Sequence, residues 1–89
     1  MKVFFKSVVM IEYPRKGLYS LGFISCEIGG EIQGKSKANI IAVFVPTTPN
    51  PTSGVLIFVP KEDLIHLEMS VEDGMKTVIS GGHFPSQIK

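Results

Sequence analysis

The chain has 89 residues, 44% of them hydrophobic and 19% charged, and a formal net charge of +1 at pH 7. Its length fits one domain, since independent domains usually contain about 50–200 residues. The nine Lys and Arg residues are scattered rather than gathered in a basic stripe, which argues against nucleic-acid binding. The single cysteine, Cys26, excludes an intramolecular disulfide and disfavours a cysteine-based metal site.

Residues 3–12 and 18–27 are predicted to form a β-hairpin, because both segments are rich in β-branched and aromatic residues. Between them, Pro14 favours an early turn position, and Gly17 can adopt the positive φ that closes a short hairpin loop. Gly22 indicates either a bulge or a close backbone approach within the second strand.

Two later segments, 39–45 and 54–59, are continuous apolar runs that each end at a proline. Such runs are typical of strands buried on both faces, so both are predicted to be central strands of the sheet. Residues 64–69 alternate loosely in polarity and are predicted to form a last, more exposed strand.

The segment 71–80 carries the clearest helix pattern of the chain. Ser70 can cap its N-terminus, and the glycines at 81–82 supply a C-terminal stop. The apolar stripe that should pack on the sheet consists of Val71, Met75, Val78 and Ile79. About five strands followed by one helix predict an α+β, mostly β fold. We expect a single soluble domain over residues 1–82 and a frayed tail over residues 83–89.

No catalytic or metal-binding constellation is evident in the sequence. Neither His66 nor His83 lies in a recognisable hydrolase motif. The acidic residues between positions 62 and 73 lack the paired His or Cys spacing of a metal site. Residues 29–36 match the wording of a phosphate-binding P-loop, but a strand-like run rather than a helix follows them. We therefore predict that the chain is not an enzyme and has no catalytic residues, cofactor or metal.

The segment 46–54, rich in proline and hydroxyl residues, is the most unusual part of the chain. Its prolines restrict the unfolded chain, which lowers the cost of ordering the segment when a partner binds. We interpret it as a candidate interaction loop. Its candidate residues are Thr47, Thr48, Pro49, Asn50, Pro51, Thr52, Ser53 and Gly54.

Three alternatives stand beside this interpretation. The hydroxyl and amide side chains of the loop could hydrogen-bond their own backbone and only hold a turn. They could instead line a pocket for a small ligand or substrate, provided that a titratable residue such as Glu12, Arg15 or His66 converges on them. The domain could also self-associate through an exposed strand edge.

Three segments of the sequence resemble those of a known family. They are residues 8–17 with Leu21-Gly22-Phe23, residues 43–54, and residues 58–63 continuing through 69–73 to 79–82. The most distinctive part is Pro46-Thr47-Thr48-Pro49-Asn50-Pro51-Thr52-Ser53-Gly54. Together, over about residues 7–82, they resemble domain-of-unknown-function family 502, the CONTINUOUS VASCULAR RING and LIKE-COV family.

The resemblance implies an integral membrane protein with hydrophobic spans near its N-terminus. No window of this chain approaches the ~20 consecutive apolar residues that cross a bilayer, so the spans are expected outside it, as in a fragment prepared for structural work. The resemblance implies the cell membrane in bacteria, and in plants the Golgi or trans-Golgi with roles in trafficking and vascular patterning. It brings no catalytic residues. We expect a non-catalytic interaction or assembly module whose partner is another protein, a second copy, or the membrane-spanning part of its own chain.

Overall fold

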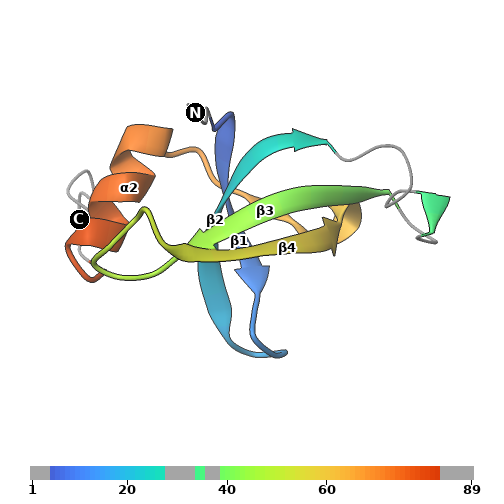
Figure 1. Cartoon of the computed structure of the whole chain (residues 1–89), viewed down its shortest axis with the longest axis horizontal. Helices are drawn as coiled ribbons and strands as arrows, with labels where there is room; N and C mark the ends of the chain where they lie inside the picture. Colours follow the sequence, from blue (N-terminus) through green and yellow to red (C-terminus); the bar gives the residue numbers. More distant parts are fainter. Residues whose placement is uncertain (1–4, 28–33, 36–38, 83–89) are drawn as a thin grey trace.

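One antiparallel sheet and one α-helix are formed by the residues that the computed structural model describes, 5–27, 34–35 and 39–82 (Figure 1). The elements in chain order are β1 (Ser7–Glu12), β2 (Tyr19–Glu27), β3 (Ile40–Pro46), β4 (Gly54–Pro60), the 3₁₀ turn η1 (Lys61–Asp63), β5 (Ile65–His66) and α2 (Val71–Ile79). The sheet order is β4-β3-β2-β1-β5. The predicted α+β, mostly β fold with a late helix is confirmed.

The β1–β2 hairpin is confirmed, and hydrogen bonds close its turn. The Tyr13 N–H donates to the Leu18 carbonyl at 2.8 Å, and the Ser20 hydroxyl donates to the Tyr13 carbonyl at 2.8 Å. Gly17 has a φ of 91°, a left-handed value that glycine adopts without a steric penalty. The peptide bond before Pro14 is cis.

Gly22 marks a close approach between strands. A Cβ atom at this position would overlap the Cγ1 atom of Val43 in β3, and Val43 is fully buried and has no room to move aside. The register irregularity of β2 lies further along the strand, between Ile24 and Glu27. Of the two roles predicted for Gly22, the structure therefore assigns the close approach.

Both faces of the sheet carry a core, because successive side chains of each strand point to opposite sides. On one face, α2 packs Val78 against Val8 and Phe23, and all three side chains are buried. The opposite face carries a second core made of Val9, Ile11, Ile24, Ile41, Val43 and Leu64. In Figure 1, β1 and β2 cross β3 and β4 at a steep angle, so the twisted sheet curls over this second core.

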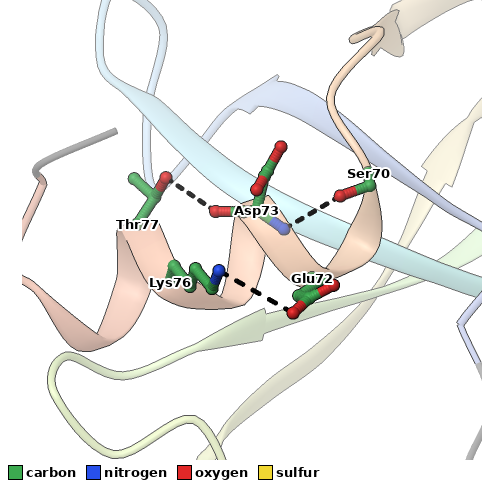
Figure 2. A network of polar contacts seen from close by, with 5 residues as sticks. All are labelled: Ser70, Glu72, Asp73, Lys76 and Thr77. Atoms are coloured by element: carbon green, nitrogen blue, oxygen red, sulfur yellow. Dashed lines mark hydrogen bonds and ion pairs between the residues drawn. The ribbon is translucent and has the colours of Figure 1, made fainter. Parts of the chain in front are cut away.

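The start of α2 is set by the predicted cap. The Ser70 hydroxyl oxygen accepts a hydrogen bond from the Asp73 N–H at 3.0 Å, which satisfies one of the free N–H groups of the first turn (Figure 2). On the exposed side, Lys76 pairs with Glu72 at 3.7 Å. The glycines at 81–82 both have positive φ, 79° and 117°, and follow the end of the helix as predicted.

The predicted apolar stripe of α2 is only partly buried. Val71, Met75 and Val78 pack toward the sheet, whereas Ile79 is 52% exposed. Gly74 is buried between them and allows the helix backbone to approach the sheet closely. The contact between helix and sheet is therefore centred on the middle of α2.

Two of the predicted strands need correction. The run 54–59 does form β4, but β4 is an edge strand rather than a central one, and most of its residues are exposed. An apolar run has the same sequence pattern whether its strand is covered on both faces or lies at an exposed edge. Within 64–69, only Ile65–His66 form a strand, and Leu64 is buried in the second core. The predicted tail 83–89 lies outside the described residues.

Candidate interaction surface

The loop over residues 46–54 connects β3 to β4 and runs beside the C-terminal end of α2 (Figure 1). At its base, the Thr47 N–H donates to the Ser53 carbonyl at 2.8 Å, and the Ser53 N–H donates to the Asn50 carbonyl at 3.3 Å. Most of its residues are exposed, while Pro51 is half-buried. The Thr48–Pro49 peptide bond is cis.

Asn50 is the centre of the hydrogen bonds inside this loop. Its Oδ1 atom accepts from the Thr52 N–H at 3.1 Å and from the Thr52 hydroxyl at 2.6 Å, and its carbonyl accepts from the Thr47 hydroxyl at 2.8 Å. Its Nδ2 atom donates to the Ser53 hydroxyl oxygen at 3.4 Å. The local hydrogen bonds that were predicted as the alternative to a binding role are therefore present. A binding role for the loop stays a prediction, and it would depend on the shape that these bonds hold.

A mostly apolar hollow of about 730 Å³, here named the helix-side hollow, lies beside the loop. Its lining residues are Phe5, Ser25, Phe44, Pro51, Thr52, Leu56 and Met75. The ring of Phe5 stacks on that of Phe44, with centroids 5.9 Å apart and planes 10° from parallel. Pro51 and Thr52 come from the loop, so the loop forms one wall of the hollow.

The titratable residues that a ligand pocket at the loop would require lie elsewhere. Glu12 is at the end of β1, where its Oε2 atom accepts from the Gly17 N–H at 3.3 Å, and Arg15 is in the same turn. His66 is in β5, at the edge of the sheet opposite β4. None of the three lines the helix-side hollow. Among the described residues, no charged residue lines the helix-side hollow.

A second hollow, of about 630 Å³, lies between the β1–β2 turn and β4. It is lined by Ile11, Glu12, Lys16, Tyr19, Ile57, Phe58, Val59, Pro60, Asp63 and Ile65. Its charged residues are Glu12, Lys16 and Asp63. Nothing in the sequence signals this hollow, because the curl of the sheet alone brings residues so far apart in the chain together.

Among the described residues, β4 carries three of the seven large hydrophobic side chains that are exposed. Val55 is 42% exposed, Leu56 59% and Phe58 41%, and the strand contains no charged residue. Edge strands of natural proteins usually carry charges, prolines or bulges that block pairing with another chain. Here Pro60 at the end of β4 is the strand's one such feature. We name Gly54–Pro60 the apolar edge.

The described ranges contain no group of three or more His, Cys, Asp or Glu residues that could hold a metal ion. No helix among them is both long and apolar enough to cross a membrane. His83 lies outside these ranges.

Known proteins are similar to this chain over most of its length. A family model described as "Protein of unknown function (DUF502)" matches residues 2–53, which is more than half of the chain and includes β1 to β3. The chain belongs to the DUF502 family. The resemblance identified from the sequence is therefore confirmed. No solved structure matches this DUF502 chain.

Relatives of the DUF502 chain occur in Arabidopsis thaliana. Over 85 residues it is 34% identical to Protein LIKE COV 1, an alignment that covers 94% of this chain and 32% of that protein. It is also 34% identical over 85 residues to Protein CONTINUOUS VASCULAR RING 1, covering 94% of this chain and 31% of that protein. The DUF502 chain thus spans about a third of the length of these relatives.

Proposed function

We propose that this DUF502 chain is a non-catalytic interaction or assembly module of a membrane-anchored protein. The observation that carries the proposal is the apolar edge, where Leu56 and Phe58 are exposed on an uncharged strand at the end of the sheet. An exposed apolar edge strand is a template for pairing with another chain, and strand addition at such an edge is a recurring mode of recognition.

The loop, the helix-side hollow and the apolar edge are contiguous, which supports one binding surface rather than three. Leu56 belongs to the edge and also lines the hollow, and Pro51 and Thr52 join the hollow to the loop. The loop leads directly into β4. Because internal hydrogen bonds already hold the loop in shape, little conformational entropy is lost when a partner contacts it.

Membrane anchorage is the second half of the proposal. Its support is the family resemblance together with the length of the relatives, about three times that of this chain. The proposed location is the cell membrane for a bacterial protein, and the Golgi or trans-Golgi for a plant protein. Fractionation of the full-length protein tests this half, and recovery in the soluble fraction without detergent would contradict it.

Proximity labelling of the full-length protein tests the interaction half. Leu56→Lys places a charge on the apolar edge, and Ile79→Lys is the matched control, since Ile79 is similarly exposed but lines neither hollow. We expect Leu56→Lys to remove partners that Ile79→Lys retains. A partner set identical in the two variants and the unsubstituted protein would overturn the proposal.

The contribution of the loop needs a separate variant. Asn50→Ala combined with Ser53→Ala removes the side-chain bonds that join these residues while leaving the apolar edge intact. If the loop contacts the partner, the labelled set shrinks as it does for Leu56→Lys. If the set is unchanged, the loop serves only to connect β3 to β4.

A further inference from the structure

The outward-facing backbone groups of β4 can be assigned from the hydrogen bonds at its two ends. The β3–β4 pairing continues for one residue at each end. At one end the Thr47 N–H donates to the Ser53 carbonyl, and at the other the Lys61 N–H donates to the Asn39 carbonyl. Hydrogen-bonded pairs alternate with non-bonded pairs along an antiparallel ladder, so the odd-numbered residues of β4 bond to β3. The residues whose backbone groups point away from β3 are therefore Gly54, Leu56, Phe58 and Pro60.

We infer that a second copy of this chain pairs antiparallel with β4, about a two-fold axis at Ile57. The inference rests on the proposed interaction role and names its partner. In this register, Leu56 of each copy lies opposite Phe58 of the other, and the two residues exchange both N–H···O=C bonds. The two sheets, each ending at β4, become one continuous sheet with an isologous contact.

This register accommodates the one residue of the edge that cannot donate. Pro60 has no N–H and lies opposite Gly54, whose N–H donates to the Pro60 carbonyl. On the face that carries α2, Leu56 packs beside Phe58 of the second copy, and both are exposed in the single chain. On the other face, Val55 lies opposite Val59. Apolar cross-strand pairs of this kind stabilise a sheet.

The distribution of charge favours antiparallel over parallel pairing. β4 follows the uncharged loop segment 47–53 and leads into the charged turn Lys61–Asp63. Antiparallel pairing places the charged turn of one copy beside the uncharged loop of the other. Parallel pairing would place identical charged residues side by side, where like charges repel.

The size of the contact indicates how it would form. A stable interface usually uses about 20–30 residues on each side. The seven residues of β4, even with the loop and the rim of the helix-side hollow, fall below this range. Pairing therefore depends on a high local concentration of the chain, which attachment of both copies to one membrane would supply.

Cysteine cross-linking in cells that express the full-length protein tests this arrangement. Opposed residues at a non-hydrogen-bonded pair have Cβ atoms about 4.5–5.5 Å apart, close to the reach of a disulfide. With copper phenanthroline as the oxidant, we expect Ile57→Cys to shift the protein to twice its mass on a non-reducing gel. Val55→Cys alone should not shift, whereas coexpressed Val55→Cys and Val59→Cys should.

Several outcomes separate this inference from the proposed function. No shift with Ile57→Cys, while partner labelling still depends on Leu56, overturns self-pairing and leaves the interaction role standing. Equal shifts for Val55→Cys and Ile57→Cys overturn the register. Adding Leu56→Lys to Ile57→Cys should abolish the shift, and the far-ultraviolet circular dichroism of purified Ile57→Cys chain checks that this half-buried substitution preserves the fold.

Discussion

Gly74 of α2 lies directly against the ring of Phe23 in β2, so that a Cβ atom on Gly74 would be 2.9 Å from Phe23 Cε2 and 3.1 Å from Val8 Cγ2. Phe23 and Val8 are fully buried, so neither has space to move away. Glycine in the middle of a helix normally costs stability. Here it permits the close contact between the helix and the sheet, and with it the core on that face.

Gly74→Ala should therefore destabilise the protein although alanine is the better helix former. Overpacking a core costs about 1–3 kcal/mol, and the gain in helix propensity is about 1 kcal/mol. We expect a net fall of about 1 kcal/mol in the free energy of unfolding, measured by urea denaturation. Phe23→Leu should relieve the overlap, so the double variant should lose less than the sum of the two single losses. Greater stability in Gly74→Ala would contradict this contact.

Ser70→Ala should lower the free energy of unfolding by about 1 kcal/mol, the usual cost of losing an N-cap. The reason is the hydrogen bond from the Asp73 N–H to the Ser70 hydroxyl oxygen at 3.0 Å. Ser70→Asp keeps an acceptor in that place and should stay within a few tenths of a kcal/mol of the unsubstituted protein. Thermal and urea denaturation measure both. Equal losses in the two variants would show that the cap bond is not the cause.

Asn50→Ala should loosen the loop between β3 and β4 with only a small effect on the whole domain. It removes the Oδ1 acceptor for the Thr52 N–H and hydroxyl, and an exposed hydrogen bond contributes about 0.5–1 kcal/mol. The sharper measurement is amide hydrogen exchange, which should become faster at Thr52. Asn50→Asp retains the acceptor and serves as the control. An unchanged exchange rate at Thr52 in Asn50→Ala would show that the Asn50 side chain does not order the loop.

Glu72→Gln should change the stability very little, although Glu72 and Lys76 form an ion pair on α2. The Lys76 nitrogen and the Glu72 oxygen are 3.7 Å apart, and the side chains of Lys76 and Glu72 are 55% and 80% exposed. Such exposed pairs contribute about 0.3–0.5 kcal/mol and are screened by salt. Urea denaturation should give a difference from the unsubstituted protein of at most about 0.5 kcal/mol at low salt, and a smaller one at high salt. A loss above about 1 kcal/mol would mean that Glu72 has a role beyond this pair.

Features that depend on neighbouring residues could be read from the sequence. The turn at Gly17, the cap at Ser70 and the stop at residues 81–82 each involve groups only a few positions apart, so their local geometry follows from residue type. The loop 46–54 was likewise identified as unusual from its composition. Its internal hydrogen bonds were expected as one alternative because they too are local.

Features that depend on distant residues were decided only by the tertiary structure. The apolar run of β4 predicted a strand, but its place at the edge depends on which strands pair with one another, and that information is absent from a single segment. The two hollows likewise arise from the curl of the sheet and the docking of α2. By itself, the sequence determined the turns, the helix and the strands other than β5, for which it predicted residues 64–69 whereas only Ile65–His66 form a strand. Long-range pairing determined that Leu56 and Phe58 lie exposed at an edge rather than buried in a core.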